Sequence, residues 1–189
     1  HRGQESAGIA TSDGTRIRLH TNMGLVNQAF REEDLERLTG HMAIGHTRYS
    51  TTGSNHPRNA QPFLVNGPNG ELALGHNGNV INAIPLRNNL IEWDCLLQST
   101  TDSEVIAHLL AQTPGKDWGQ RIAATMRRLQ GAYCLVVQTK DSILAIRDPL
   151  GLHPLCIGKL GTKGWVQVFI TKTCYAESLN SSPFYSIYK

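Results

Sequence analysis

The spacing of apolar residues changes along the chain from strand-like to helical and back again. Near the start, residues 15–20 alternate after the turn sequence Ser12-Asp13-Gly14, which is typical of a hairpin. Ile17 and Leu19 are predicted to point inward and the arginines beside them toward water. The same reading predicts further strands at 42–46, 62–65, 72–74, 132–138, 143–147 and 165–170.

Four segments in the first two thirds of the chain have helical spacing. They cover residues 30–38, 81–90, 103–112 and 117–130. The third is the clearest, because four aliphatic residues at 105, 106, 109 and 110 share one face and either Thr101 or Asp102 can cap it. Beyond about residue 171 no pattern is evident. Strands around a central block of helices predict a single layered α+β domain.

Composition agrees with a globular chain. The 189 residues are 40% hydrophobic and 17% charged, with 18 glycines and a net charge of +3, which fits one domain rich in turns. Arg127-Arg128 is the only adjacent basic pair, so we expect no nucleic-acid partner. No apolar run approaches the roughly 18–20 residues of a membrane span, and the first residues do not resemble a signal peptide. We therefore expect no membrane association and a cytoplasmic location.

Metal and disulfide chemistry have little support in the sequence. The four cysteines at 95, 134, 156 and 174 are far apart, without the spacing of a zinc ribbon or a disulfide scaffold. His46 and His76 stand beside polar segments, but neither has an acidic or cysteine neighbour at ligand spacing. Hydrogen-bonded structural histidines are favoured over metal ligands or general bases, and no metal site is predicted.

Three polar segments that lie between apolar ones carry the candidate chemistry. They are residues 45–53, 76–79 and 101–104. Arg48 offers a fork for a carboxylate, and Asp102 offers a partner for an ammonium group. Asn77 and Gly78 offer two N–H donors for a developing oxyanion. Together these groups suit a free amino acid whose side chain ends in an amide or ester.

Each of these residues also has a simpler interpretation. Arg48 could form a surface salt bridge, Asp102 could cap the helix that follows it, and Asn77-Gly78 could be no more than a turn. For Asp102 the cap and the binding role are compatible.

Five ordered motifs within about residues 1–160 resemble one known family. They are residues 1–9, 45–53, 76–78, 102–104 and 147–151. The set closely resembles the glutaminase domain of the glutamine phosphoribosylpyrophosphate amidotransferase (amidophosphoribosyltransferase) family. This resemblance implies an N-terminal-nucleophile (Ntn) hydrolase fold of the class II glutamine amidotransferases, a four-layer αββα sandwich in which two antiparallel sheets pack face to face between helices.

The resemblance also implies site roles. Arg48 would bind the α-carboxylate of glutamine and Asp102 its α-ammonium group, while the Asn77 side chain and the Gly78 N–H would form the oxyanion hole. Arg2 and Gly3 would lie near the nucleophile. Tyr49 and Thr51 are candidates for the wall of the glutamine pocket, and the alternative is that they have no role there.

In the family, the nucleophile is a cysteine at the mature N-terminus, whose free amine relays a proton near neutral pH. This chain begins at His1, so that cysteine is expected a few tens of residues upstream. The chain itself is expected to be a fragment with no glutaminase activity and with no cofactor of its own.

The remaining domain assignments follow from the resemblance. Residues 1–170 would be the glutaminase domain and residues 171–189 a tail of uncertain structure. A phosphoribosyltransferase domain, absent here, would use Mg²⁺ and phosphoribosyl pyrophosphate to make 5-phosphoribosylamine in de novo purine synthesis. Some members also carry an iron–sulfur cluster there, and the parent enzyme is expected to be a homo-oligomer. Two departures stand out: His153 replaces the usual arginine, and the sequence after residue 169 matches no family pattern.

Three alternatives remain open at this point. The chain could belong to another class II amidotransferase such as glucosamine-6-phosphate synthase, although the opening motif differs, and asparagine synthetase is more distant. It could instead be a non-catalytic glutamine-binding or interaction module. Finally, it could be too incomplete to fold stably, because loss of an N-terminal strand would expose a sheet edge.

Overall fold

The computed structural model describes residues 5–49, 56–160, 164–169 and 185–188, with the backbone alone for residues 159, 160, 164–169 and 185–188. The first sheet has the order β2-β1-β3. Its strands are β1 (Ser6–Ser12), β2 (Ile17–Met23) and β3 (Met42–Arg48). β1 lies in the centre and pairs antiparallel with both neighbours. Two short helices, α1 (Val26–Ala29) and α2 (Glu32–Arg37), connect β2 to β3.

The second sheet is larger and has the order β10-β7-β6-β5-β4. Its strands are β4 (Phe63–Gly67), β5 (Gly70–Val80), β6 (Gly131–Gln138), β7 (Ile143–Arg147) and β10 (Tyr185–Tyr188), all paired antiparallel. A separate hairpin contains β8 (Leu155–Leu160) and β9 (Gly164–Phe169). A 3₁₀ turn, η1 (Pro57–Asn59), precedes β4.

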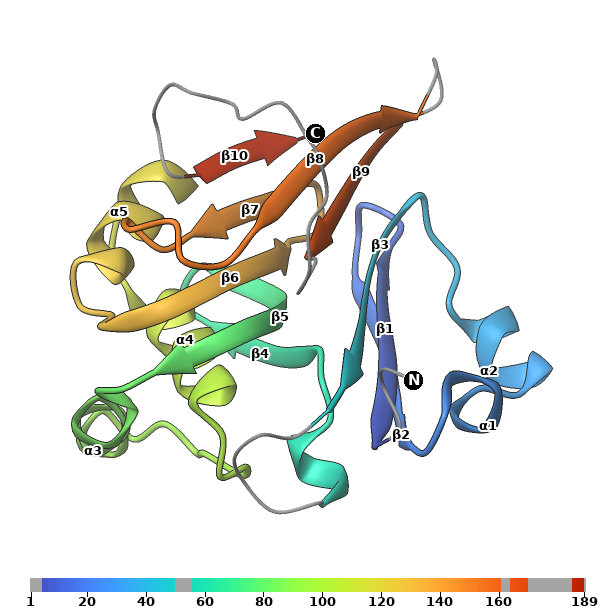
Figure 1. Ribbon diagram of the computed structural model, residues 1–189, viewed down its shortest axis with the longest axis horizontal. Coiled ribbons are helices and arrows are strands. Elements are labelled where there is room, and N and C mark those ends of the chain that lie inside the picture. Colours follow the sequence, from blue (N-terminus) through green and yellow to red (C-terminus); the bar gives the residue numbers. More distant parts are fainter. Residues whose placement is uncertain (1–4, 50–55, 161–163, 170–184, 189) are drawn as a thin grey trace.

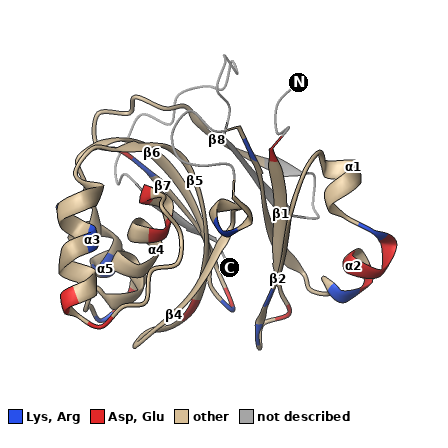
Figure 2. Cartoon of the chain, turned by 90° about the horizontal axis from the view of Figure 1, so that it is seen from below, with Lys and Arg blue, Asp and Glu red and all other residues tan. Residues whose placement is uncertain are grey.

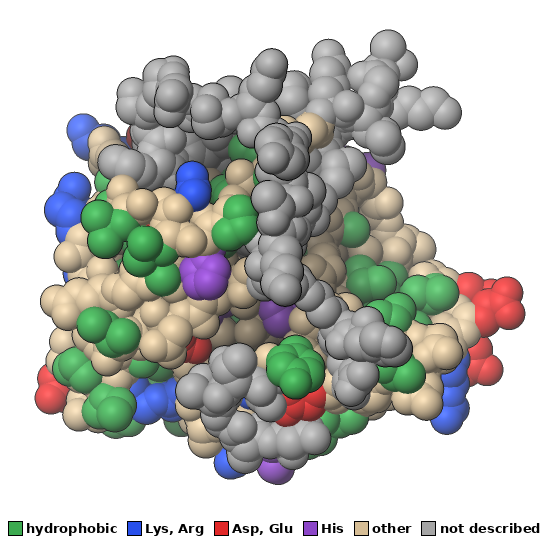
Figure 3. All heavy atoms as spheres, viewed as in Figure 1, with side chains coloured by type: hydrophobic (Ala, Val, Ile, Leu, Met, Phe, Trp, Pro, Cys, Tyr) green, Lys and Arg blue, Asp and Glu red, His purple; other side chains and the backbone are tan. Residues whose placement is uncertain are grey.

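The elements form four layers. Helices α3 (Ala83–Glu92), α4 (Asp102–Gln112) and α5 (Trp118–Met126) cover one face of the second sheet. The first sheet stands against the other face, and α1 and α2 lie outside it (Figures 1 and 2). This αββα order is the fold class that the sequence predicted. Acidic side chains gather at the edge of the molecule where α2 lies (Figure 3).

Alternation along β5 explains how one strand serves two layers. Leu72 and Leu74 face the helices and belong to the large core cluster there. Ala73, between them, belongs to a smaller cluster between the two sheets, with Ile44 of β3 and Val136 of β6. Successive side chains on a strand point to opposite faces, so residues 75 and 77 are directed toward the first sheet and residue 76 toward the helices.

Several details differ from the sequence-based expectations. The helix predicted over 30–38 is shorter, α2 at Glu32–Arg37, because Phe30 and Arg31 are extended, and the one-turn helix α1 before it was not predicted. Leu19 is 36% exposed rather than buried, since β2 is an edge strand. The last helix ends at Met126 instead of residue 130. A strand, β10, pairs with β7 in the tail where no pattern was evident.

No helix among the described residues is long and apolar enough to cross a membrane.

Candidate functional site

Arg48 is the last residue of β3 and lies opposite Ser6 of β1 in the register. Its side chain is buried, and its Nη1 donates to Glu5 Oε1 at 2.8 Å. The interpretation of Arg48 as a surface salt bridge is therefore wrong, because both partners of this ion pair are shielded from water. A buried guanidinium held in this way is pre-oriented for a carboxylate.

Asn77 and Gly78 lie inside β5, opposite Cys134 and Tyr133 of β6. The turn interpretation of this pair is therefore wrong. Gly78 has a φ of +147°, and a Cβ placed on it would lie 2.1 Å from the carbonyl oxygen of Ala132. Only glycine allows β5 and β6 to approach this closely here. Asn77 is half-buried and Gly78 is exposed, so this stretch of backbone is open to a ligand.

Asp102 is the first residue of α4, but it does not cap the helix. The cap is Thr101, whose side chain accepts from the N–H of Glu104. Asp102 Oδ2 instead accepts from the N–H of Val80 at 2.9 Å. The cap interpretation of Asp102 is therefore wrong, and its carboxylate joins the start of α4 to the end of the strand that carries Asn77.

His46 and His76 are both hydrogen-bonded, as predicted. His46 Nε2 contacts the carbonyl oxygen of His76 at 3.1 Å, across the two sheets. His76 Nδ1 lies 2.9 Å from Ser103 Oγ and 3.7 Å from Asp102 Oδ1. Gln61 completes this cluster, since its amide contacts both the N–H of His76 and Ser103 Oγ.

Burial keeps both histidines neutral at physiological pH. It lowers the pKa of His46 to about 4, with the nearby Arg48 charge as a smaller cause. Burial also lowers the pKa of His76, against the opposing effect of Asp102. A neutral imidazole donates or accepts single hydrogen bonds without adding charge. The described residues contain no group of three His, Cys, Asp or Glu side chains placed to hold a metal ion.

These contacts connect the three predicted segments. Arg48 and His46 both lie on β3, and His46 contacts the carbonyl oxygen of His76, the residue before Asn77 on β5. The ring of His76 in turn lies 3.7 Å from Asp102 Oδ1. A buried cation, a partly buried carboxylate and an accessible strand with amide donors therefore belong to one connected region. Such a set can hold a zwitterion and an oxyanion. Tyr49 is 66% exposed. Arg2, Gly3 and Thr51 lie outside the described residues.

Two cysteines in the described part of the chain, Cys95 and Cys134, are poor nucleophiles. Cys134 is buried, and burial raises its pKa to about 12. Its thiol donates to the carbonyl oxygen of His153 at 3.4 Å. Burial also raises the pKa of Cys95. Because the thiolate is the reactive species, neither of these two residues is suited to attack an amide.

The loop after β7 contains the departure at His153 and is held by its own side chains. Asp148 is buried and accepts from the N–H groups of Leu150 and Leu152. Arg147 Nε donates to the carbonyl oxygen of His153 at 2.6 Å. The described contacts of His153 with Arg147 and Cys134 use its backbone carbonyl, a group that any residue supplies.

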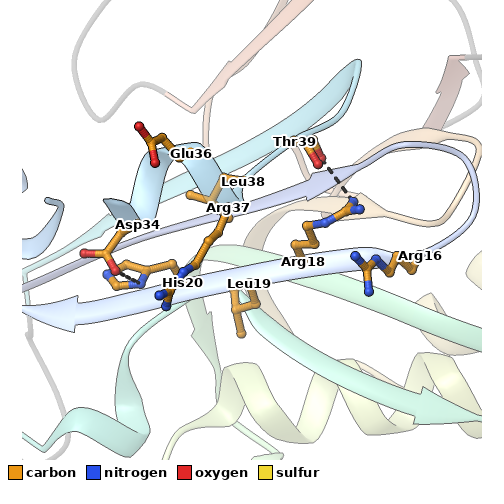
Figure 4. Close-up of a pocket in the computed structure, with 9 residues that line it drawn as sticks. All are labelled: Arg16, Arg18, Leu19, His20, Asp34, Glu36, Arg37, Leu38 and Thr39. Atoms are coloured by element: carbon orange, nitrogen blue, oxygen red, sulfur yellow. Dashed lines mark hydrogen bonds and ion pairs between the residues drawn. The ribbon is translucent and has the colours of Figure 1, made fainter. Parts of the chain in front are cut away.

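A hollow of about 540 Å³ lies elsewhere, between α2 and β2 (Figure 4). Two of its lining side chains, Arg18 and His20, pair with carboxylates. Arg18 contacts Asp13 at 2.7 Å, and His20 contacts Asp34 at 3.5 Å. None of the five predicted site residues in the described chain lines it. The hollow is therefore separate from the candidate site.

The fold and the site together define a class of protein. The glutamine amidotransferase domain family matches residues 46–169, about two thirds of the chain, and the chain belongs to that family. Solved structures include a glutamine aminotransferase class-II domain protein from Silicibacter pomeroyi, with a TM-score of 0.56 and 16% identity over 89% of this chain and 82% of that one. That likeness concerns the fold alone.

More similar relatives share one name. The amidophosphoribosyltransferase of Synechococcus elongatus is 47% identical over 177 residues, covering 92% of this chain and 36% of that protein. The human amidophosphoribosyltransferase is 46% identical over 170 residues, covering 85% and 33%. The structure of the Bacillus subtilis glutamine phosphoribosylpyrophosphate amidotransferase has a TM-score of 0.79 at 38% identity, covering 88% of this chain and 36% of that one.

These similarities confirm the fold expected from the motifs, the Ntn-type sandwich of a class II glutamine amidotransferase. The chain spans about a third of the length of the curated relatives that it matches.

Proposed function

We propose that the chain is the glutaminase part of an amidophosphoribosyltransferase. The observation that carries the proposal is the connected arrangement of Arg48, Asn77-Gly78 and Asp102, because these residues lie in three separate motifs and meet through His46 and His76. Amidophosphoribosyltransferases from several organisms are 46–48% identical to the chain over most of its length. Residues 1–170 would form this domain, and β10 (Tyr185–Tyr188) of the tail adds a strand to its second sheet.

In this proposal, glutamine binds through both of its charged ends. Arg48 pairs with the α-carboxylate and Asp102 with the α-ammonium group, which leaves the side-chain amide directed toward Asn77 and Gly78. As a thiolate attacks that amide, the carbonyl oxygen gains negative charge. The Asn77 side chain and the Gly78 N–H then stabilise it, a contribution of typically about 3 kcal/mol per donor. Tyr49, Thr51, Arg2 and Gly3 would contact the same substrate.

The thiolate would come from an N-terminal cysteine of the longer protein, because Cys95 and Cys134 are held as thiols by burial. The cysteine attacks the carboxamide, ammonia leaves, and water hydrolyses the thioester. Ammonia would then pass to a phosphoribosyltransferase domain that binds phosphoribosyl pyrophosphate and Mg²⁺. No ligand set for Mg²⁺ or an iron–sulfur cluster is present among the described residues. We further propose a homo-oligomeric parent enzyme in the cytoplasm.

Glutamine binding tests the site without needing the nucleophile. Isothermal titration calorimetry of the chain with L-glutamine is expected to show binding, and Arg48→Ala is expected to weaken it by about tenfold or more, since a hydrogen bond to a charged group contributes roughly 1.5–3 kcal/mol. Arg16→Ala is the control, because Arg16 is an exposed residue directly before β2. Equal affinity of the wild-type chain and Arg48→Ala would refute the proposed pocket.

Ammonia release separates catalysis from binding. The 189-residue chain is expected to bind glutamine without releasing ammonia, whereas the longer protein beginning with a free cysteine is expected to release it. Binding without release in both proteins would favour the alternative, a non-catalytic glutamine-binding module. Release by the short chain that Arg48→Ala abolishes would show that a residue within the chain supplies the nucleophile.

A further inference from the structure

In each of the three site segments, a polar residue lies one or two positions from the residue that is proposed to bind the substrate. His46 precedes Arg48 by two positions, His76 directly precedes Asn77, and Ser103 directly follows Asp102. His76 and Ser103 are fully buried, and His46 has a polar ring atom that is buried. All three also contact one another in series.

The first contact joins the two sheets. His46 Nε2 lies 3.1 Å from the carbonyl oxygen of His76, and a carbonyl oxygen can only accept. His46 must therefore carry its proton on Nε2 when neutral. Because that carbonyl belongs to the peptide bond between His76 and Asn77, this hydrogen bond fixes the backbone that leads into the proposed oxyanion hole.

The second contact joins β5 to the start of α4. His76 Nδ1 lies 2.9 Å from Ser103 Oγ, and Gln61 Nε2 donates to the same oxygen at 3.1 Å. The N–H of His76 donates to Gln61 Oε1 at 2.7 Å. His76 is thus held at its N–H, its carbonyl and its ring, and residue 77 has little freedom to shift along the strand.

The third contact reaches the carboxylate. Ser103 Oγ lies 3.4 Å from Asp102 Oδ1, and the other oxygen, Oδ2, accepts from the N–H of Val80 at 2.9 Å. Val80 ends the same strand that carries Asn77. Asp102 is therefore positioned by groups from its own helix and from β5, while its side chain keeps a fifth of its surface exposed.

We infer that His46, His76 and Ser103 form a buried relay of positioning residues, which sets the distances between Arg48, the Asn77-Gly78 donors and Asp102. This inference rests on the proposed function, since it concerns how that same site is held. The relay does not touch the substrate. It fixes the spacing between Arg48, the partner of the carboxylate, and Asp102, the partner of the ammonium group, independently of the surrounding loops. A site of fixed spacing loses less conformational entropy when the substrate binds.

Hydrogen bonding suits this task better than apolar packing would. A hydrogen bond of about 3 Å with a defined direction places two strands to within a few tenths of an ångström, whereas aliphatic side chains of similar volume exchange with little cost. Misplacement of about 1 Å in such a site can cost on the order of 100-fold in rate.

The test uses variants that either remove or keep the first hydrogen bond. His46→Leu removes the donor, while His46→Gln keeps an N–H at the position of Nε2. We expect His46→Leu to weaken L-glutamine binding by roughly tenfold and His46→Gln by less than about threefold. His20→Leu is the matched control, because His20 Nε2 contacts the Ala29 carbonyl at 2.9 Å from β2, without a contact to the site segments.

Nuclear magnetic resonance of the ligand-free chain gives a readout that a loss of stability alone would not produce. The imidazole nitrogen shifts of His46 should show a proton on Nε2 and none on Nδ1. In His46→Leu, the amide resonances of Asn77, Gly78 and Val80 should shift, and in His20→Leu they should not. If His46→Leu fails to fold, Ser103→Ala takes its place and is expected to weaken glutamine binding and shift the Val80 amide.

The outcomes separate the relay from the site itself. If the wild-type chain and Arg48→Ala bind glutamine equally, the proposed pocket fails. If Arg48→Ala loses affinity while folded His46→Leu or Ser103→Ala binds as the wild type does, the pocket stands and the relay is refuted. The relay is also refuted if His46 is protonated on Nδ1.

Discussion

The two faces of the second sheet are stabilised in different ways. The face toward α3, α4 and α5 packs a large cluster of fully buried leucine and isoleucine side chains. Between this sheet and the first sheet, the buried core cluster among the described residues has five members, two of which are alanines. Polar contacts cross that second interface instead, and the candidate site lies at it. Because hydrophobic stabilisation scales with the apolar area buried, we expect the helix-facing core to contribute most of the stability and the sheet–sheet layer to set positions.

Four hydrogen bonds illustrate the polar layer. Ser12 Oγ donates to the Lys140 carbonyl, Gln138 Nε2 to the Met42 carbonyl, the Ile17 N–H to Glu71 and His46 Nε2 to the His76 carbonyl. Each joins the first sheet to the second or to the turn beside it. Directional contacts fix register and distance, which apolar packing alone leaves adjustable.

The largest loss of stability is expected from a substitution in the helix-facing core. Leu109→Ala, at a fully buried position of α4, should reduce the free energy of unfolding by about 2–5 kcal/mol, because it removes apolar contacts and leaves a cavity. Urea denaturation monitored by circular dichroism measures this. Ile84→Ala in α3, where the side chain is 74% exposed, should change stability by less than about 0.5 kcal/mol. Equal losses would contradict the comparison.

A smaller effect is expected from acid on the polar layer. The folded pKa of His46 is about 4, against an ordinary value of 6.5, so between these values the unfolded chain binds a proton that the folded chain does not. The stabilisation is complete above about pH 6.5 and is lost as the pH falls. As the pH falls from 6.5 to about 5, protonation of His46 in the unfolded chain should lower the free energy of unfolding by about 1–2 kcal/mol.

His46→Gln does not titrate and provides the control for this acid effect. Its free energy of unfolding should fall less than that of the wild type over the same pH range, in urea titrations at each pH. Burial also lowers the pKa of His76 and His108, so some dependence in the same direction will remain. Parallel curves for the two proteins would show that His46 is not the titrating group.

The smallest effect concerns one cross-sheet hydrogen bond. Gln138→Leu removes the donor to the Met42 carbonyl and should lower the free energy of unfolding by about 1 kcal/mol, the typical net value of such a bond. The exposed Gln130 before β6 offers a control in Gln130→Leu, which should be close to neutral. A loss as large as that of Leu109→Ala would mean that the polar layer also dominates stability.

Local sequence signals predicted the parts of the fold that depend on nearby residues. Helix α4 matches its prediction, because a cap at Thr101 and a continuous apolar face occur within eleven residues. The strand at 185–188 was missed, since its four residues are placed by pairing with β7, about forty positions earlier. Helix α1 was not predicted, because its four residues, Val26–Ala29, are too few to show an apolar periodicity.

For the site, the motifs identified segments rather than contacts. Arg48, Asn77 and Asp102 were selected from their chemistry and from a family resemblance, and the structure places them in one connected region; their roles stay predictions. The contact of Glu5 with Arg48 and the role of Gln61 were not foreseen. Gln61 and Ser103 are 42 positions apart, and no spacing rule encodes a meeting of side chains over that distance.

The glycine at position 78 sets a limit on redesign. Because any larger residue there would collide with the neighbouring strand at Ala132, a library that randomises this stretch would lose most members before selection began. New substrate preferences would have to arise from neighbours such as the exposed Asn79, because the Asn77 side chain is itself a proposed oxyanion donor.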